Sequence, residues 1–518
     1  MKPIMIQATG SDAGKTTLVA GLCRLFANRG LRVAPFKAQN MSLNSYVTAD
    51  GGEIARATAM QAAGARQEPN AHMNPLLLKP KADDVAQLIV HGKPVRDVSA
   101  AEYFLVPERL QQQKLEAITA SIAYLRQHYD LIIAEGAGSC AEPNLRRLDV
   151  VNMGAAHLLE ARVFIAGDID RGGVFAGFLG ALEVLRLTQP EDLGLVEGLL
   201  INKFRGDPAV LQPGLEFMKA HCPVPIAGVL PFVTDLRLEE EDRVREHRCL
   251  HPEVDLAVVY LPHISNANDF DFLADEANVQ LRYVRSAGEL GVPDAVILPG
   301  TKNTTWDLDY IRRTGLAKAV AQQVGRVPLV GICGGFQMLG RMLHDPDRLE
   351  SDLGSMPGLG LLDFEVTFRP HKTLVKRTYT PTRDNPFAAA GPVAGYEIHC
   401  GDVRYGACQP CFVHEGGNEG GVDRREPSAG GGDPDGSAGG AGGRAPRGID
   451  GGVDPDRLIF GTFIHDIFAN PAFTRVFIDL LRRRKGLATL SQPLPRPRDR
   501  MEESYERMAA ALERLAIF

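Results

Sequence analysis

Short apolar runs alternate with amphipathic stretches through the first part of the chain. The runs have the length of buried strands, and the stretches between them repeat apolar residues at helical spacing. This alternation predicts βαβ units and therefore an α/β fold with a mostly parallel sheet. The predicted strands cover residues 4–8, 33–37, 131–135, 163–168, 199–203 and 226–230.

The same alternation starts again near Val254. Its predicted strands cover residues 256–261, 281–284, 295–298, 328–332 and 458–463. A chain of 518 residues is long enough for two domains with separate cores. We therefore expect a first α/β domain over residues 1–250 and a second over residues 251–485.

Two stretches interrupt this pattern. Residues 415–452 are rich in Gly, Asp, Pro and Arg and contain almost no large apolar residue, which predicts a disordered insertion of unassigned role. Residues 486–518 begin with a Pro/Arg-rich hinge and continue as a predicted helix over residues 502–518. Apolar residues at helical spacing, among them Tyr505 and Leu512, indicate that this helix packs on a domain.

Composition limits the class of protein. A net charge of −7 leaves no global basic surface for nucleic acid. No apolar run reaches membrane-spanning length and no signal peptide precedes the first strand, so we expect a cytoplasmic protein. Eight scattered cysteines indicate reduced thiols. Cys408 and Cys411 form the one CxxC pair, for which a redox or metal role and two incidental thiols both stay open.

The loop after the first strand has the residues of a phosphate-binding loop. Backbone N–H groups at a helix start face an anion, Lys15 adds a positive charge, and Thr16 offers a hydroxyl to Mg²⁺. A Gly-rich turn without a ligand is the alternative, but such a turn has no need of Lys and Thr at the helix start. The predicted ATP-binding residues are Gly10, Asp12, Gly14, Lys15, Thr16 and Thr17.

Polar residues follow the other strands of the first domain. Ligands of parallel sheets lie at the carboxyl ends of strands, so these positions matter most. Asp50 and Glu135 are placed to complete a magnesium site with Thr16. A helix cap or an exposed loop is the alternative for either carboxylate taken alone. The remaining polar residues at strand ends include Lys37, Gln39, Asn40, Asn202 and Lys203.

A cysteine stands at a sharp strand-to-helix turn in the second domain. Cys333 follows an apolar strand and precedes Gly334 and Gly335, as in a nucleophile elbow. The helix start lowers the pKa of such a thiol. A buried structural cysteine would not need the glycines. A thiol nucleophile needs a base, for which His465 is the leading candidate and His399 the competitor, although either could be a core histidine.

Long stretches around these residues resemble the cobyric acid synthase family. The resemblance runs in family order over nearly the whole chain, apart from the insertion and the extreme C-terminus. It rests on residues 35–45, 48–54, 73–80, 135–139, 168–175, 201–207, 299–304, 331–340 and 395–399.

The resemblance implies an ATP-dependent glutamine amidotransferase of cobalamin biosynthesis. Such enzymes amidate the b, d, e and g carboxylates of adenosylcobyrinic acid a,c-diamide to give adenosylcobyric acid. The resemblance also implies a first domain similar to dethiobiotin synthetase and a second similar to class I glutamine amidotransferases. It leaves a homo-oligomer open.

The resemblance further implies a role for each matched residue. Lys15 and Thr16 would bind the ATP phosphates and Mg²⁺, with Asp50 and Glu135 completing the metal site. Other matched positions would serve the acceptor (Lys37, Gln39 and Asn40), the adenine (Asn202 and Lys203), glutamine hydrolysis (Cys333 as nucleophile and His465 as base) and the oxyanion (the N–H groups of Gly300 and Gly334).

Three positions depart from the expected patterns. Ala8 stands where the phosphate loop would have its leading Gly, and Asp466 where the family usually has Gly. Ile467 occupies the position of the usual triad Glu, which the resembling family generally lacks. Its absence implies glutamine hydrolysis that is slow or coupled to the other site.

Two other functions remain open from the residues. An a,c-diamide synthase shares both modules, but the stretches at residues 39–41 and 168–175 favour cobyric acid synthase. A P-loop switch ATPase that carries an inactive amidotransferase-like module is the rival from another class. The intact cysteine elbow argues against it.

Overall fold

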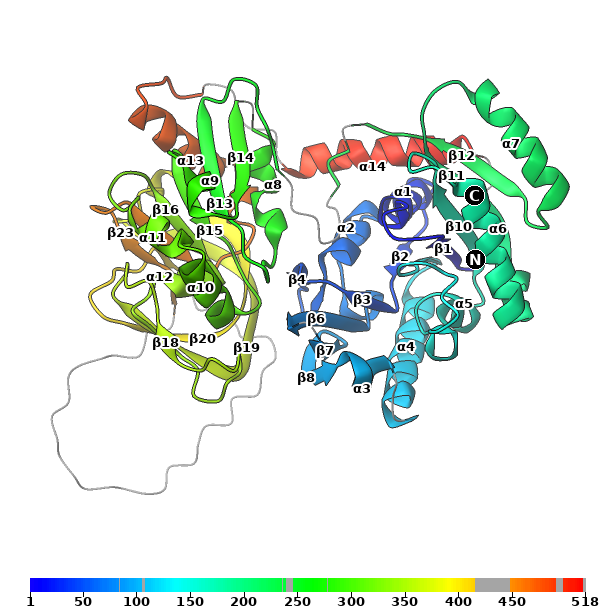
Figure 1. The fold of residues 1–518 in the computed structure, drawn as a ribbon, viewed down its shortest axis with the longest axis horizontal. Coiled ribbons are helices and arrows are strands. Elements are labelled where there is room, and N and C mark those ends of the chain that lie inside the picture. The colour runs from blue at the N-terminus through cyan, green and yellow to red at the C-terminus, as the bar shows by residue number, and fades with distance from the viewer. Residues whose placement is uncertain are drawn as a thin grey trace. The chain divides into compact units, whose positions relative to one another are not determined.

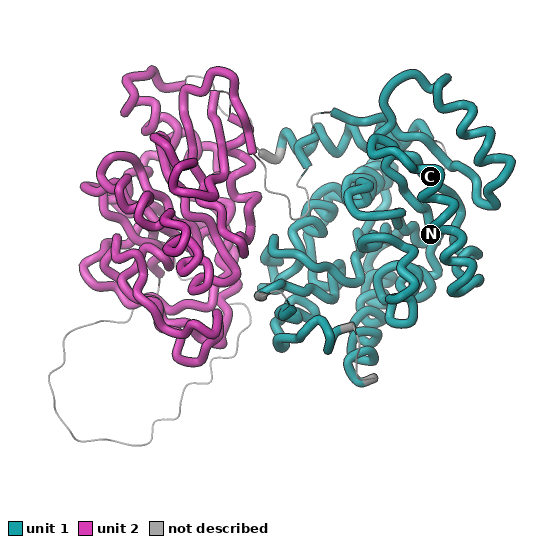
Figure 2. The backbone as a smooth tube through the Cα atoms, viewed as in Figure 1, with its two compact units in different colours: residues 1–243, 497–518 teal, residues 244–496 magenta. Residues whose placement is uncertain are grey.

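The computed structural model describes residues 1–82, 84–104, 108–234, 236–238, 246–276, 278–414, 448–490 and 497–515 (Figure 1). The chain forms two units, one of Met1–Arg243 with Pro497–Phe518 and one of Val244–Arg496 (Figure 2). The chain therefore leaves the first unit, completes the second, and returns to the first.

The first unit is built on a six-stranded parallel sheet of order β12-β11-β10-β1-β9-β2. The α/β fold predicted from the alternation of the sequence is thus confirmed. Its strands are β1 (Ile4–Ala8), β2 (Val33–Phe36), β9 (Leu131–Glu135), β10 (Arg162–Asp168), β11 (Val196–Phe204) and β12 (Ile226–Pro231).

Helices cover both faces of this sheet because side chains alternate along each strand. Ile4 and Ile6 pack with residues of α1 and α14, whereas Met5 packs with residues of α4 and α6. The long helices of the unit are α1 (Lys15–Asn28), α2 (Arg56–Gly64), α4 (Glu108–His128), α5 (Met153–Leu159), α6 (Val174–Thr188), α7 (Pro208–His221) and α14 (Pro497–Glu513), and the short α3 is Ala100–Phe104.

A second, smaller sheet of order β3-β6-β7-β8 lies in the same unit beside a two-stranded hairpin, and neither is predicted by the sequence. Its first pair is parallel and the others are antiparallel. The strands are β3 (Gln39–Met41), β6 (Leu76–Ala82), β7 (Val85–Val90) and β8 (Lys93–Ser99), with β4 (Ser45–Val47) and β5 (Glu53–Ala55) in the hairpin.

The second unit has its own six-stranded sheet of order β14-β13-β15-β16-β24-β23, parallel except for the last pair. Its strands are β13 (Val254–Val259), β14 (Val279–Val284), β15 (Ala295–Leu298), β16 (Leu329–Ile332), β23 (Gly452–Asp454) and β24 (Ile459–Thr462). Its helices are α8 (Asp271–Ala274), α9 (Ala287–Leu290), α10 (Thr304–Arg313), α11 (Leu316–Ala321), α12 (Gly334–Leu339) and α13 (Pro471–Arg484).

A further sheet follows α12 in the chain and has the strand order β18-β17-β19-β21-β22. Its long strand β19 also forms an antiparallel pair with β20. Its strands are β17 (Met342–His344), β18 (Met356–Pro357), β19 (Phe364–Pro381), β20 (Val393–Tyr405), β21 (Phe412–Val413) and β22 (Ile449–Asp450). The predicted disordered insertion is wrong at its C-terminal end, because Ile449 and Asp450 pair with β21. Residues 415–447 of that insertion lie outside the described residues.

The C-terminal helix α14 packs on α1, as the apolar spacing of the sequence predicts. It begins at Pro497 and ends at Glu513, earlier in the chain than the predicted residues 502–518. Among the described residues, no helix combines the length and the apolar character needed to cross a bilayer.

Candidate active sites

The predicted phosphate loop connects β1 to α1 in a conformation that requires glycine. Gly14 has φ 90°, and a Cβ atom there would overlap the Asn202 side chain. The Lys15 ammonium donates to the carbonyl oxygens of Gly138 (2.8 Å) and Gly10 (3.2 Å). The loop therefore sets a lysine and the first N–H groups of α1 at the carboxyl end of β1, the arrangement that a phosphate-binding loop requires.

Three predicted residues meet beside this loop. Thr16 Oγ1 donates to Glu135 Oε1 (2.8 Å), and the same oxygen accepts from Lys37 Nζ (3.1 Å). Lys37 and Glu135 are both buried. Gln61, which the sequence did not single out, donates from its amide to Glu135 Oε2. A hydroxyl and a carboxylate are hard oxygen ligands, so the residues fit Mg²⁺.

Residues at the end of β11 hold the phosphate loop from the other side. Asn202 donates from its amide to the Ala13 carbonyl (2.8 Å). Lys203 Nζ donates to the Asp12 carbonyl (2.6 Å) and to Asp168 Oδ2 (2.8 Å). Asp12, at φ 59°, is also in the left-handed region. The predicted Thr17 lies half-buried in the first turn of α1.

The other predicted residues of this unit lie farther along the chain. Gln39 is on β3 and accepts from the Tyr103 hydroxyl, and Asn40 beside it is buried. Asp50 is exposed in the turn between β4 and β5, where it accepts from the Thr48 hydroxyl. Within the described part of the chain no contact joins Asp50 to Thr16 or Glu135, so its metal role stays a prediction.

Cys333 occupies the sharp turn between β16 and α12. Its backbone has φ 51° and ψ −109°, a conformation that non-glycine residues rarely adopt. A Cβ atom at Gly335 would lie 2.0 Å from the Leu298 carbonyl oxygen, and one at Gly334 would lie 3.0 Å from the Thr301 nitrogen. The glycines thus allow the close approach that a nucleophile elbow needs.

His465 lies beside this thiol and faces a carboxylate on its other side. Its Nδ1 lies 2.6 Å from Asp269 Oδ2, and the Cys333 thiol is within its hydrogen-bonding reach. Burial alone lowers the pKa of His465, but the charges of Asp269 and Cys333 outweigh burial and raise the pKa to about 10. The imidazole of His465 is therefore held in its charged form beside the thiol.

Asp269 was missed by reasoning from sequence. It lies on a short 3-10 helix, Ala267–Phe270, 196 residues before the histidine, and also accepts from the Asp466 N–H (2.9 Å). The usual triad acid stands two residues after the histidine, where this chain has Ile467, so sequence spacing does not indicate Asp269. The available signal was the polar run at residues 265–271, which follows the carboxyl end of β13.

The competing histidine has other partners. His399 Nε2 lies 3.0 Å from Glu397 Oε2, and its ring stacks on Phe463 at 3.8 Å. Burial opposes ionisation of Glu397, yet the bond and charge of His399 lower the pKa of this carboxyl. No contact in the described ranges joins His399 to Cys333, so the geometry favours His465 as the base.

The two predicted oxyanion glycines border the cysteine. Gly334 is the first residue of α12, and Gly300 follows β15. A Cβ atom at Gly300 would lie 3.2 Å from His465 Cε1. Both positions can therefore present backbone N–H groups without a side chain between them and a substrate.

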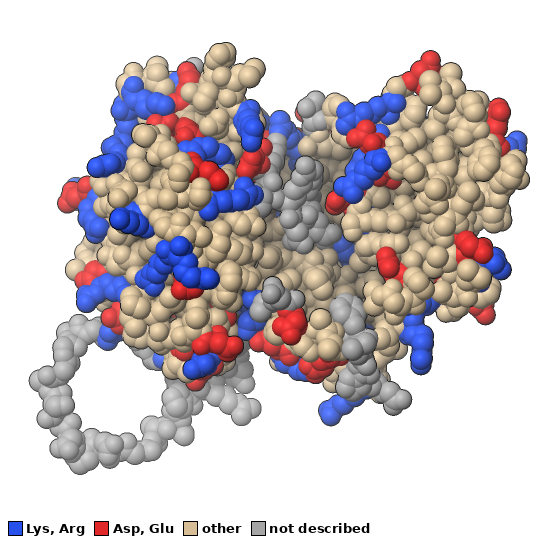
Figure 3. All heavy atoms as spheres, in the orientation of Figure 1, with Lys and Arg blue, Asp and Glu red and all other residues tan. Residues whose placement is uncertain are grey.

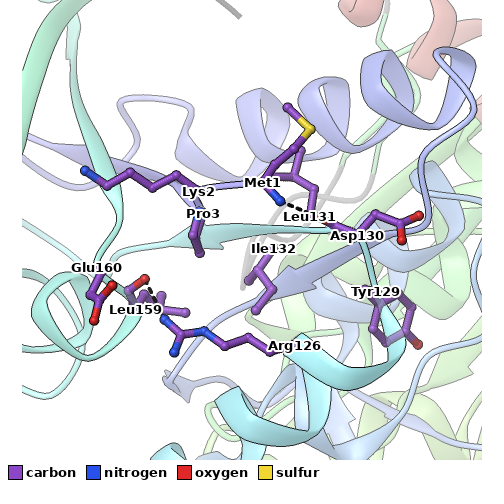
Figure 4. A pocket seen from close by; sticks show the side chains of 10 residues that line it. All are labelled: Met1, Lys2, Pro3, Arg126, Tyr129, Asp130, Leu131, Ile132, Leu159 and Glu160. Carbon is purple, nitrogen blue, oxygen red and sulfur yellow. Dashed lines mark hydrogen bonds between the residues drawn. The ribbon is translucent and has the colours of Figure 1, made fainter.

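A pocket of about 650 Å³ lies at the amino-terminal ends of the strands of the first sheet (Figure 4). Residues before β1 and β10 and around the start of β9 line it, including Met1, Arg126 and Glu160. The predicted phosphate-binding residues follow the carboxyl ends of these strands, so this pocket is separate from the predicted nucleotide site.

Charge on the molecular surface is mixed. On the face drawn in Figure 3, Lys and Arg side chains are interspersed with Asp and Glu on both units. Cys408 and Cys411 are free thiols; Cys411 is buried and Cys408 partly buried. Burial raises the pKa of Cys408 to about 11, so this thiol is poorly suited to thiolate chemistry.

The fold and both sites define a class of protein, a glutamine amidotransferase joined to a nucleotide-binding domain. Residues 4–244 match the CobQ/CobB/MinD/ParA nucleotide binding domain, and residues 255–473 match the CobB/CobQ-like glutamine amidotransferase domain. The chain belongs to the cobyric acid synthase family. It is therefore a ligase that carries out glutamine-dependent amidation in cobalamin biosynthesis.

Two relatives show the extent of the similarity. The chain is 45% identical to the cobyric acid synthase of Pelotomaculum thermopropionicum over 94% of its own length and 89% of the relative's. It is 43% identical to that of Klebsiella pneumoniae subsp. pneumoniae over 99% and 96%. Among solved structures, PurLQS from Thermotoga maritima is 17% identical and covers 45% of this chain and all of its own, with a TM-score of 0.31.

Proposed function

We propose that the chain amidates the b, d, e and g carboxylates of adenosylcobyrinic acid a,c-diamide, with ATP and glutamine as co-substrates, and releases adenosylcobyric acid. The proposal extends the family assignment to a defined substrate. The observation that carries it is the Cys333 elbow with a charged His465 in one unit, together with the Lys37–Glu135–Thr16 cluster in the other.

In the first unit a carboxylate becomes an acyl phosphate. A carboxylate is a poor electrophile, so its oxygen attacks the γ-phosphorus of ATP and ADP leaves. Lys15 and Lys37 offset the negative charge that gathers on the transferred group. Mg²⁺ held by Thr16 and Glu135, with Asp50 as a further proposed ligand, would neutralise charge on the phosphates.

The remaining residues of this unit bind and orient. Asn202 and Lys203, which hold the phosphate loop, are proposed to lie near the adenine. Gln39 and Asn40 are proposed to contact the acceptor. Gly10, Asp12, Gly14 and Thr17 complete the proposed ATP site.

In the second unit ammonia is released from glutamine. The Cys333 thiolate attacks the carboxamide carbon, and the N–H groups of Gly300 and Gly334 stabilise the oxyanion. His465 gives its proton to the leaving nitrogen, and a thioester remains. Water then cleaves the thioester, so that glutamate leaves and the thiol is restored. Ammonia displaces phosphate from the acyl phosphate to form the amide.

The experiment separates the two nitrogen sources. Cys333→Ser is expected to lose amidation with glutamine and to keep it with ammonium chloride, because only the first source needs the thiol. Mass spectrometry of the corrinoid counts the amides formed with each source. Loss of both activities in a folded variant would contradict the proposed role of the thiol.

The rival ATPase function gives a different result in the same assay. A switch protein with an inactive amidotransferase module would release no glutamate from glutamine. The buried His465–Asp269 pair beside the thiol supports hydrolysis rather than a binding module, because burial of a charged pair without a function is costly.

A further inference from the structure

The helix that follows the second unit in the chain is built into the first. Helix α14 packs along α1, with Tyr505, Met508 and Leu512 at most 4% exposed. Figure 1 shows α14 (red) next to α1 (dark blue), the helix that begins with Lys15 of the proposed phosphate site. Nothing in the proposed mechanism uses α14.

The approach of these helices depends on two glycines. A Cβ atom at Gly21 of α1 would lie 2.7 Å from Leu512 Cδ1, and one at Gly64 of α2 would lie 3.1 Å from Tyr505 Cε1. Helix α14 therefore touches the backbones of both α1 and α2, and a change in its position is transmitted to them directly.

A buried guanidinium joins the three helices. Arg24 of α1 is 0% exposed and donates to the Gly64 carbonyl at the end of α2 (2.8 Å). The same guanidinium donates to Glu502 and Glu506 of α14. A buried cation needs charged partners, so the two α14 carboxylates allow Arg24 to hold the end of α2.

A second contact leads to the nucleotide site. The Tyr505 hydroxyl donates to the Met60 carbonyl of α2 (2.7 Å). The next residue, Gln61, is fully buried and donates from its amide to Glu135 Oε2 and to the Thr16 carbonyl (3.3 Å). Two hydrogen bonds and the peptide bond between Met60 and Gln61 thus connect α14 to the carboxylate of Glu135 beside the phosphate loop.

We propose that α14 is a positioning element of the nucleotide site: it holds α2 so that Gln61 orients Glu135 toward Thr16. Tyr505, Glu502, Glu506, Arg24 and Gln61 are its positioning residues, and none touches a substrate. The inference rests on the proposed role of Glu135 as a magnesium ligand. On this proposal, the ATP-dependent half of the reaction depends on a segment that follows the glutaminase unit in the chain.

The test uses the full chain with Glu502→Gln, Tyr505→Phe and Glu506→Gln combined. Glu503→Gln is the matched control, since Glu503 is exposed on α14 and has no partner among the described residues. Titration calorimetry measures binding of a non-hydrolysable ATP analogue with and without Mg²⁺. Ammonia-dependent amidation gives the Mg²⁺ concentration for half-maximal rate.

We expect the combined variant to bind the analogue about tenfold more weakly with Mg²⁺. The variant weakens the hydrogen bonds of α14 to Arg24 and Met60, and the loss of a hydrogen bond to a charged group has an effect of about this size. Binding without Mg²⁺ and glutamine hydrolysis should not change. The half-maximal Mg²⁺ concentration should rise about tenfold, and the rate should recover at high Mg²⁺. A merely structural role would instead lower the rate with the folded fraction and leave the Mg²⁺ dependence unaltered, which would overturn the proposal.

Two further variants separate the causes. Gln61→Met removes only the amide, and combined with the α14 changes it should add less than the sum of the two effects, because both act through one path. Full additivity would overturn the proposed path. Glu135→Gln tests the underlying metal role: if it leaves the Mg²⁺ dependence intact, the proposed function fails at this residue, and the inference fails with it.

Discussion

Asp269 and Asp450 are two buried carboxyl groups next to the segment that carries His465, and their neighbours differ. Asp269 faces the imidazole at 2.6 Å. Asp450 accepts from the Phe463 N–H (3.0 Å) and is bonded to the Thr462 hydroxyl. Burial and the charge of the neighbouring Glu397 raise the pKa of Asp450 to about 7. One acid stabilises a cation, and the other keeps its proton up to nearly neutral pH.

Asp269→Asn should reduce glutamine hydrolysis by about 10²- to 10⁴-fold, the usual contribution of a positioned acid–base group. The variant removes the negative charge that raises the pKa of His465, so the imidazolium loses its proton at lower pH. The alkaline limit of kcat/KM for glutamine should therefore move to lower pH. Initial-rate pH profiles of glutamate release measure this shift.

Amidation with ammonia serves as the control for that variant and should not change. Asp402→Asn, at an exposed carboxylate of the same unit, is the matched substitution. An unshifted pH profile in Asp269→Asn would show that the acid does not act on His465.

Asp450→Asn should change how stability depends on pH. A raised folded-state pKa stabilises the fold below pH 4, and this contribution is lost as pH rises to about 7. Each pKa unit corresponds to about 1.4 kcal/mol, so an effect of about 4 kcal/mol is expected. The asparagine has no proton to lose, so the variant should gain stability relative to the parent between pH 4 and pH 8.

Thermal unfolding at a series of pH values gives this comparison, with Asp402→Asn again as control. The facing groups are Glu397, Tyr379, Tyr405, Cys411 and Thr462, and none is altered in the variant. A stability difference that stays constant over the whole pH range would rule out a titrating Asp450.

At the scale of elements, the two active sites use the same local device. Each places a short, glycine-containing turn between a parallel strand and a helix, so that helix N–H groups and a reactive side chain meet at the carboxyl end of the strand. Lys15 follows β1 in one unit, and Cys333 follows β16 in the other. In the proposed function, one turn receives phosphate and the other an oxyanion.

The short hairpin β21–β22 borders the stretch at residues 415–447. Val413 pairs with Ile449, and the His414 N–H donates to the Gly448 carbonyl (2.8 Å). Two residues this close can be joined by a tight turn. Replacement of residues 415–447 by Asn-Gly should therefore preserve the hairpin, which holds Asp450 in place.

Glutamine hydrolysis of that variant should stay within about twofold of the parent. Its free energy of unfolding should rise by about 2 kcal/mol, because the loop is shortened by about four halvings of its length and each lowers the closure cost by about 0.6 kcal/mol. Glutamate release and denaturant unfolding measure both. A loss of hydrolysis in a stable variant would assign the deleted stretch a role in the reaction.

Most strands of the two large sheets could be predicted from the sequence, because strands such as β15 and β16 are short apolar runs buried on both faces. Residues 131–135 and 295–298 are predicted and observed with the same limits. The sheet containing β19 and β20 could not be predicted, since its strands are half-exposed and mix polar with apolar residues. Their pairing depends on partners distant in the chain.

At the scale of the whole molecule, the chain forms two units with separate cores. After completing the second unit, it returns to the first. The first unit is complete only when Pro497–Glu513 returns to α1. The second unit, Val244–Arg496, is inserted between the two parts of the first. Amide synthesis and glutamine hydrolysis are thus assigned to separately folded parts of one chain.

The sequence by itself determined the α/β class and predicted the phosphate loop and the cysteine elbow, because each depends on residues close together in the chain. Only the tertiary structure set His465 rather than His399 beside Cys333, set Asp269 against His465 and Gln61 against Glu135, and packed α14 on α1. Those contacts join residues far apart in sequence, and a buried charge takes its partner from whichever element folding brings beside it.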